Sequence, residues 1–371
     1  MLKNALFSLF TTFILICLVE GALQLLNYPY YQPEVRVGWK YQGKDKEHLN
    51  QLGFRGQKIK YDSTDKVVLL LGDSQVEADG CAFEQMPEKH LQTALQKSMP
   101  NIKVFSIGAG GYGTDQELLA LQEYFKHFRA DLVLVWITPS NDVWNNLFPT
   151  HIPKDGTPKP TFWLENHQLK GYQFKPDSLV IKNSPFKLVH LFQRVFDNPL
   201  KGIDDNWAKQ TMPPSYTPES QYKASFLDWT GHKTENLVNE KAHNAIQFSP
   251  VSARTKYGIE LTQALFEKLK QTSTENKAKI VYFYRDEYPE ISTDTSSSVI
   301  KQGNGFYTIS KKQYNINIKN LVQPFQGIRL PILVKDWRVS PEDGHLSAKA
   351  NEQVMKSLAD SLQKKRPKLS F

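Results

Sequence analysis

Residues 67–74 read VVLLLGDS. A continuous run of branched apolar side chains is typical of a strand buried on both faces of a parallel sheet, and the Gly-Asp-Ser after it is typical of a tight turn into a helix. Four further runs of this kind lie downstream: VFSIG (104–108), LVLVWIT (132–138), IVYFY (280–284) and LPILV (330–334). The sequence therefore predicts a central parallel sheet of about five strands.

Segments with helical periodicity separate these runs. Between 114 and 128 the apolar residues fall on one helical face, and Thr114 and Glu117 have the spacing of a capping box. Residues 256–271 carry a second apolar stripe, and residues 346–362 carry apolar side chains at every fourth position. Strands that alternate with helices predict an α/β fold, a three-layer α/β/α sandwich with helices on both faces of the sheet.

Two stretches depart from this alternation. Residues 145–250 are rich in Pro, Trp, Tyr and Asn, which predicts an irregular insertion over the end of the sheet. Residues 286–325 are polar and predict a further long connection. The tryptophans of the insertion region fit two interpretations, stacking against carbohydrate or packing in a core. They are Trp144, Trp163, Trp207 and Trp229.

The N-terminal segment is long and apolar enough for one membrane-spanning helix. It covers residues 6–26 and contains a single acidic residue, Glu20. Tyrosines suited to the membrane interface follow it: Tyr28, Tyr30 and Tyr31. A cleavable signal peptide is the alternative, but no A-x-A-like site follows the apolar run. We expect residues 1–30 to be an uncleaved transmembrane signal anchor, and residues 31–371 to form an extracytoplasmic domain, periplasmic in a Gram-negative bacterium.

The composition excludes several classes of protein. The 371 residues include 46 Lys and Arg against 38 Asp and Glu, a net charge of +8, and 40% of the residues are hydrophobic. An intrinsically disordered chain, a collagen-like repeat and a polytopic membrane protein all fit this composition badly. The basic residues are scattered except in the C-terminal tail, so nucleic acid is not expected as a partner. The only two cysteines, Cys17 and Cys81, predict neither an internal disulfide nor a structural zinc site.

Polar motifs follow the first three predicted strands. Ser74 comes directly after the first strand, where α/β folds present a nucleophile. The glycine-rich stretch 106–114 follows the second strand, where a backbone N–H can point at a developing oxyanion. Asn141 follows the third strand and offers a side-chain amide donor to the same oxyanion. These positions meet at the carboxyl edge of a parallel sheet, where open α/β folds build their sites.

A fourth motif stands just before the last predicted helix. His345 is preceded by Asp343 and Glu342, at a spacing that lets a carboxylate orient an imidazole, which then deprotonates a serine. Taken singly, each of the four motifs is more often a helix cap or a turn. Their common place at the ends of strands favours a catalytic site. A P-loop and a metal-binding carboxylate cluster are missing, which disfavours nucleotide binding or phosphatase chemistry.

These four blocks resemble those of the SGNH/GDSL hydrolase superfamily. The resemblance implies a flavodoxin-like sandwich in which Ser74 is the nucleophile and His345 the base. It also implies an oxyanion hole made by the N–H groups of Ser74 and Gly111 and by the Asn141 amide, and no metal or organic cofactor. The segment 50–56 (NQLGFRG) is similar to the one that precedes the first block in membrane-anchored members.

Two positions depart from the usual pattern of the superfamily. Ser140 stands where a glycine usually precedes the Asn-Asp pair. The acid of the triad usually lies three residues before the histidine, which points to Glu342. Polysaccharide-acetylating relatives use an aspartate two residues before it, which points to Asp343, the residue that we favour.

The resemblance implies acyl transfer through a serine ester, and three functions fit it. The first is a membrane-tethered esterase that acts on O-acylated carbohydrate or lipid esters. The second is an O-acetyltransferase of exopolysaccharide or cell-envelope glycan that uses the same serine. The third belongs to another class, a catalytically silent glycan-binding assembly factor. The expected partners are the acylated glycan or lipid, the membrane, and proteins of envelope polysaccharide assembly.

Overall fold

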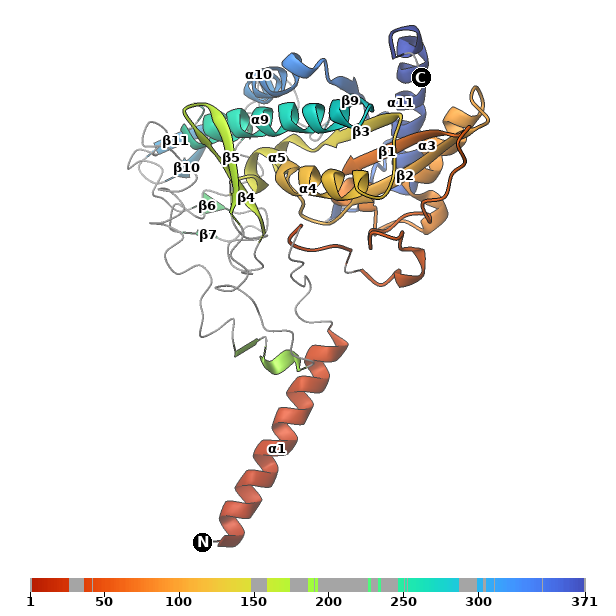
Figure 1. Cartoon of the computed structure of the whole chain (residues 1–371). Helices are drawn as coiled ribbons and strands as arrows, with labels where there is room; N and C mark the ends of the chain where they lie inside the picture. Colours follow the sequence, from red (N-terminus) through yellow and green to blue (C-terminus); the bar gives the residue numbers. More distant parts are fainter. Residues whose placement is uncertain are drawn as a thin grey trace.

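The computed structural model (Figure 1) describes residues 2–26, 37–41, 43–147, 159–173, 186–189, 191–192, 226–227, 233–234, 246–249, 251, 253–286, 299–302, 305–309, 311–341 and 343–369. Its central sheet contains β1 (Lys66–Gly72), β2 (Ile102–Gly108), β3 (Leu132–Ile137), β9 (Lys279–Arg285) and β12 (Ile328–Leu330), in the order β12-β9-β3-β1-β2. All neighbours in this sheet are parallel. The predicted five-stranded parallel sheet is therefore confirmed.

The strand order determines where a site can lie. From β1 the chain crosses first to β2 on one side, and then to β3, β9 and β12 on the other side. This reversal creates a topological switch point between β1 and β3, and ligands of open α/β sheets bind at the carboxyl ends of the strands beside such a point. Ser74 and Asn141 follow the two strands that flank it.

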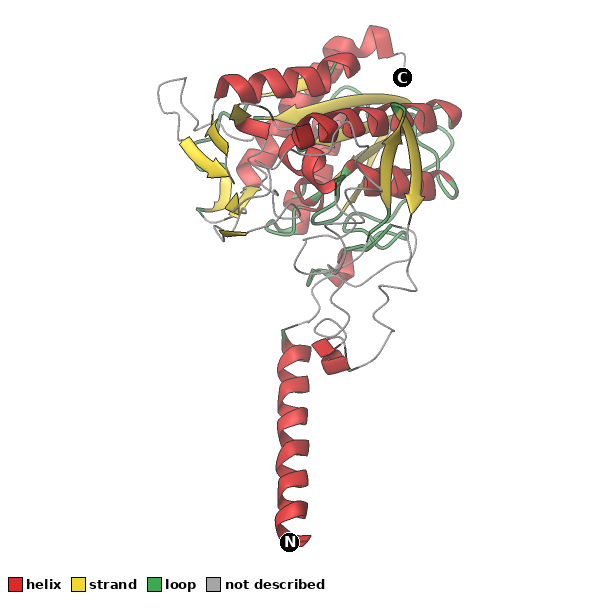
Figure 2. Ribbon diagram, turned by 90° about the vertical axis from the view of Figure 1, so that its left-hand side faces the viewer, coloured by secondary structure: helices red, strands yellow, loops and turns green. Residues whose placement is uncertain are grey.

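Helices cover both faces of the sheet, as predicted (Figure 2). Because successive side chains of a strand point to opposite faces, Val67 and Leu69 of β1 pack on one side, with α4 (Thr114–Phe125), α9 (Ala253–Glu275) and α10 (Lys311–Val322). Val68 and Leu70 pack on the other side, with α3 (Pro87–Gln96) and α11 (Ala348–Leu369). The three-layer α/β/α sandwich is thus confirmed.

Four local predictions were wrong. Gly113, not Thr114, is the N-cap of α4 and makes no side-chain cap, so the capping box does not form. The run LPILV begins only as β12 ends at Leu330, because Pro331 has no N–H for the sheet. Leu346 belongs to strand β14 (Asp343–Leu346) rather than to the last helix. The stretch 286–325 includes strands β10 (Val299–Gln302) and β11 (Gly305–Ile309) and the whole of α10.

The insertion contains regular structure at its start. Strands β4 (Thr161–Glu165) and β5 (Gln168–Gln173) form an antiparallel hairpin that lies against α9. Trp144, in α5 (Pro139–Asn145), is 3% exposed and belongs to the hydrophobic core, which excludes it as a stacking surface for carbohydrate. Trp163 of β4 is half-buried. Trp207 and Trp229 lie outside the described residues.

Further short elements complete the described chain. Strands β6 (Phe226–Leu227) and β7 (Lys233–Thr234) pair with each other, and β8 (Phe248–Ser249) joins β11. Helix α2 (Ser74–Glu77) follows β1, and β13 (Arg338–Ser340) pairs with β14. Single 3₁₀ turns occur at η1 (Lys46–His48), η2 (Phe83–Gln85) and η8 (Gln323–Phe325).

The N-terminal segment forms α1 (Leu2–Leu25), which projects from the rest of the chain (Figure 1). Within it, Phe7–Leu25 is long and apolar enough to cross a membrane, although a signal sequence would meet the same criteria. Most of its large apolar side chains are exposed. The tyrosines expected at the membrane interface lie outside the described residues: Tyr28, Tyr30 and Tyr31.

Candidate active site

Ser74 is the first residue of α2, directly after the turn that ends β1. Asp73 caps this helix: its carboxylate accepts the backbone N–H of Gln75 at 2.9 Å. A Cβ atom on Gly108, the last residue of β2, would lie 2.7 Å from the carbonyl oxygen of Asp73 and 2.8 Å from Cβ of Val76. Only glycine therefore lets β2 end against the Ser74 turn.

His345 and Asp343 form a pair on β14. The imidazole Nδ1 lies 2.5 Å from Oδ1 of Asp343, and the backbone N–H of His345 donates to the same oxygen at 3.0 Å. Strand β14 lies against α2, the helix that begins with Ser74. The contact with Asp343 engages Nδ1, and Nε2 is the other ring nitrogen, the one that a triad histidine turns to its serine. Glu342, the other candidate acid, lies outside the described residues.

The pKa of His345 reflects opposing influences. Burial lowers the pKa, but the hydrogen bond and the charge of Asp343 raise it, and the charge of Asp73 raises it further, so the pKa lies above its ordinary value. The hydrogen bond from His345 in turn lowers the pKa of Asp343, despite the opposing effect of its partial burial. The pair is therefore an imidazole with an ionised carboxylate behind it, the arrangement that a general base requires.

The three predicted oxyanion donors are the backbone N–H groups of Ser74 and Gly111 and the side-chain amide of Asn141. Gly111 has a φ of +74°, and its carbonyl accepts from the Asn145 side chain at 3.1 Å. Asn141, in the first turn of α5, donates one amide hydrogen to Asp73 at 2.7 Å, and an amide nitrogen carries two. In the part of the chain that the structure describes, the backbone N–H groups of Ser74 and Gly111 have no acceptor. An oxyanion hole requires donors of this kind.

The structure adds Glu77, a residue that the sequence analysis missed. Its buried carboxylate accepts the backbone N–H of Gly110, beside the proposed oxyanion donor Gly111. Burial raises the pKa of Glu77 to about 8, with a contribution from the charge of Asp79. Glu77 lies one helical turn after Ser74, so this contact joins α2 to the glycine-rich loop. Nothing in its local sequence marks it.

Arg55 ties the segment 50–56 to the same region. Its buried guanidinium donates to the carbonyl oxygens of Glu77, Ala78 and Cys81 at 3.1, 2.7 and 2.8 Å. It also donates to Asp45 at 2.8 Å. The NQLGFRG motif, which the sequence analysis singled out only as a resemblance, thus holds the end of α2 and the chain that follows it.

Arg285 is a second residue that the sequence analysis missed. It is the last residue of β9, at the carboxyl edge of the sheet, and only 5% exposed. Its guanidinium lies over the ring of Trp337, 5.2 Å from the centroid, and donates to the carbonyl oxygen of Gly344 at 3.3 Å. Gly344 separates Asp343 from His345, so Arg285 holds the backbone of the pair. Its charge also lowers the pKa of His345.

This contact predicts a measurable pH effect. The predicted base is the neutral form of His345, so activity should fall as the pH drops through its pKa, which lies above the ordinary value of about 6.5. Replacing Arg285 by glutamine removes a positive charge that lowers this pKa, so the acidic limb of kcat/KM should move to higher pH. Arg285→Lys should leave the limb close to that of the wild type.

A neighbouring arginine supplies the control for this prediction. Arg338 also lies over the Trp337 ring, 4.6 Å from the centroid, but it donates to the carbonyl oxygen of Pro341, whereas Arg285 donates to that of Gly344. Arg338→Gln should therefore leave the acidic limb unchanged. If the Arg285→Gln variant keeps the wild-type melting temperature and its acidic limb of kcat/KM stays at the wild-type pH, the proposed coupling of Arg285 to His345 is contradicted.

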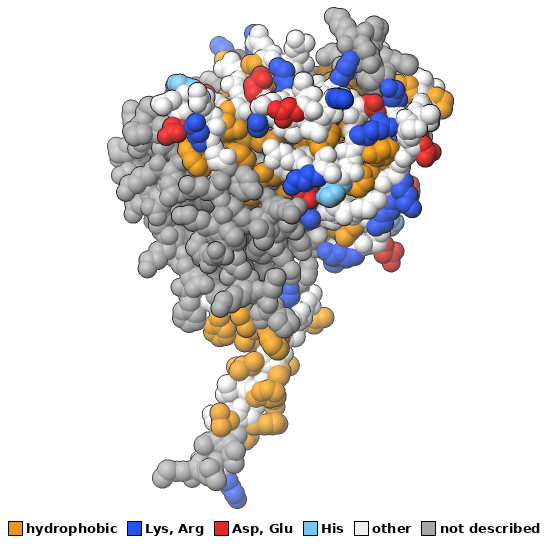
Figure 3. Space-filling model, viewed as in Figure 1, with side chains coloured by type: hydrophobic (Ala, Val, Ile, Leu, Met, Phe, Trp, Pro, Cys, Tyr) orange, Lys and Arg blue, Asp and Glu red, His pale blue; other side chains and the backbone are white. Residues whose placement is uncertain are grey.

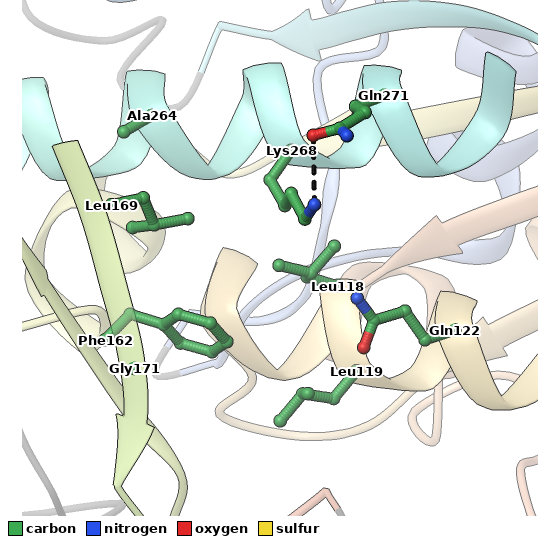
Figure 4. Close-up of a pocket in the computed structure, with 9 residues that line it drawn as sticks. All are labelled: Leu118, Leu119, Gln122, Phe162, Leu169, Gly171, Ala264, Lys268 and Gln271. Carbon is green, nitrogen blue, oxygen red and sulfur yellow. Dashed lines mark hydrogen bonds between the residues drawn. The ribbon is translucent and has the colours of Figure 1, made fainter. Parts of the chain in front are cut away.

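A groove of about 570 Å³ lies away from these residues, between α4, α9 and the β4–β5 hairpin (Figure 4). Phe162 of the hairpin points toward α4, and Lys268 of α9 donates to Gln271 at 2.9 Å. The groove lies on one helical face of the sandwich rather than at the carboxyl edge of the sheet. None of its lining residues belongs to the predicted site.

Comparisons with known proteins give distant structural likenesses only. No family model matches the sequence, and the comparison with curated proteins gives no match. A psychrotrophic esterase from a Pseudoalteromonas species shares 10% identity and a TM-score of 0.36, over 81% of this chain and 98% of that one. A carbohydrate acetylesterase family member from Sinorhizobium meliloti shares 14% identity and a TM-score of 0.32, over 82% and 100%.

A putative GDSL-like lipase from Parabacteroides merdae shares 12% identity and a TM-score of 0.34, over 82% of this chain and 99% of that one. Likenesses this distant do not assign an activity. The residues around Ser74 must carry that assignment.

Proposed function

We propose that the chain is a serine acyl hydrolase of the SGNH/GDSL type, in which an ester transfers its acyl group to Ser74. His345 takes the hydroxyl proton during attack, and Asp343 orients the ring and stabilises the imidazolium. The His345 imidazolium gives that proton to the leaving oxygen, which departs as the alcohol. Water then releases the acid from the acyl-serine. The observation that carries the proposal is the Asp343–His345 pair, held against the helix that begins with Ser74.

The oxyanion of each tetrahedral intermediate would be bound by the N–H groups of Ser74 and Gly111 and by the second amide hydrogen of Asn141. Asp73 supports this arrangement without reacting, because its two carboxylate oxygens hold Gln75 and Asn141. Donors fixed in this way need little reorganisation when charge develops on the substrate oxygen. The mechanism uses only residues of this chain.

We further propose that α1 anchors the enzyme in a membrane, with the catalytic domain outside the cytoplasm. The support is the apolar length of Phe7–Leu25 and the exposure of its side chains. The proposed substrates are O-acylated carbohydrate or lipid esters of the cell envelope. Water is the acyl acceptor in this proposal, and transfer to a sugar hydroxyl is the alternative that the experiment distinguishes.

The experiment uses the full chain in lipid nanodiscs. We expect turnover of p-nitrophenyl acetate and stoichiometric labelling by a fluorophosphonate probe. An O-acetylated oligosaccharide is then offered with and without an unacetylated acceptor. Release of acetate at an unchanged rate supports hydrolysis, whereas acetylated acceptor would assign the transferase function. A folded chain that neither reacts with the fluorophosphonate probe nor turns over ester would overturn the proposed enzymatic function and favour the silent binding factor.

A further inference from the structure

The acidic residue within the apolar span has partners in a distant segment. Glu20 lies five residues before the end of α1. One of its carboxylate oxygens accepts the backbone N–H of Lys187 at 2.8 Å, and the other accepts that of Leu188 at 2.7 Å. Gln24 also donates to it, at 2.6 Å. The carboxylate therefore holds the first turn of a segment more than 160 residues away in the sequence.

That segment, called the 186–192 segment here, presents apolar side chains to the outside in its described residues, 186–189 and 191–192. It lies beside the end of α1 that is nearer to the rest of the chain (Figures 1 and 2). Its exposed fractions are 60% for Phe186, 38% for Val189 and 52% for Phe192. Exposed apolar side chains also run along α1 (Figure 3). Water would oppose such a continuous apolar surface, whereas lipid would favour it.

We propose that the 186–192 segment lies in the interface of the same bilayer that α1 spans, with its apolar side chains among the lipid acyl chains. Five residues of helix correspond to about 7.5 Å, so Glu20 would reach the depth of about 5–10 Å at which interfacial helices are buried. A charged side chain at this depth must be paired, and the two N–H groups supply its hydrogen bonds.

The occupant of this surface is lipid rather than protein, because the surface continues that of the candidate membrane span. The chain then contacts the bilayer through two segments that are distant in the sequence, α1 and the 186–192 segment. A second contact restricts rotation of the catalytic domain about α1. The inference rests on the membrane anchoring proposed above, but it does not depend on ester turnover.

The test places an environment-sensitive NBD fluorophore at position 189 of the full chain. The chain used for labelling carries Cys17→Ser, because Cys17 is exposed and would react with the fluorophore. Cys81 is buried and is left in place. Val189→Cys is labelled in vesicles of phosphatidylethanolamine and phosphatidylglycerol. We expect blue-shifted emission, quenching by nitroxide lipids and protection from aqueous iodide. Leu333→Cys is the matched control, because Leu333 is 73% exposed and lies in a different part of the fold. Its probe should be quenched by iodide.

Glu20→Ala should abolish the blue shift at position 189, because the segment loses its attachment to α1.

Alkaline carbonate extraction of the same vesicles reports separately on anchoring. If the chain resists extraction but the probe at position 189 is quenched by iodide and not by nitroxide lipid, the inference is wrong and the anchoring stands. Complete extraction would overturn both. Ester turnover, measured in parallel, reports on the catalytic proposal alone.

Discussion

Replacing Ser74 by alanine is expected to reduce kcat for ester hydrolysis on the order of 10⁶-fold and to abolish fluorophosphonate labelling. The oxygen removed is the atom that forms the acyl bond, and without it His345 has no hydroxyl to deprotonate. The fold should be retained, because Asp73 still caps α2 through the backbone N–H of Gln75. The measurements are p-nitrophenyl acetate turnover, labelling stoichiometry and the melting temperature.

Ser347→Ala is the matched control for Ser74→Ala. Ser347 lies two residues after His345, but its hydroxyl donates to the carbonyl oxygen of Asp336 at 2.9 Å and takes no part in the proposed site. This variant should label at full stoichiometry and lose no more than a few-fold in kcat. A Ser74→Ala chain that still labels at full stoichiometry would show that another side chain is the nucleophile.

The sheet could be predicted from the sequence because its strands are buried on both faces. Runs such as VVLLLG and LVLVWI have few alternatives in a folded chain. Helix α10 escaped prediction because it is polar overall and buries only one stripe, which includes Tyr314, Ile318 and Leu321. Its position therefore depends on contacts with α9, and a sequence segment read by itself does not contain that information.

The candidate site was predictable to the extent that its residues follow strands. Ser74, the glycine-rich stretch 106–114 and Asn141 could be singled out because parallel strands deliver their carboxyl ends to one edge. The choice of Gly111 within that stretch comes from the resemblance to the superfamily. Glu77 and Arg285 could not, because their importance comes from partners far away in the sequence. Glu77 accepts from Gly110, and Arg285 donates to Gly344, 59 residues later. Such contacts exist only once the layers are assembled.

The choice between the two candidate acids yields the second large prediction. Asp343→Asn should reduce kcat by roughly 10⁴-fold, because an amide nitrogen beside Nδ1 favours the wrong tautomer of His345 and no longer stabilises the imidazolium. The hydrogen bond and charge of Asp343 raise the pKa of His345, so their loss should lower that pKa. The acidic limb of the residual activity should therefore move to lower pH, in the opposite direction to that of Arg285→Gln.

Glu342→Gln is the matched control for Asp343→Asn, since it makes the same change of acid to amide at the neighbouring position. With Asp343 within 2.5 Å of the imidazole, Glu342→Gln should stay within a few-fold of the wild type in kcat and keep its acidic limb. Both variants are measured for p-nitrophenyl acetate turnover across the pH range. A large loss in Glu342→Gln, with Asp343→Asn near the wild type, would transfer the orienting role to Glu342. If Asp343→Asn lowers kcat but leaves the acidic limb of the pH profile at the wild-type pH, Asp343 only supports the structure of β14.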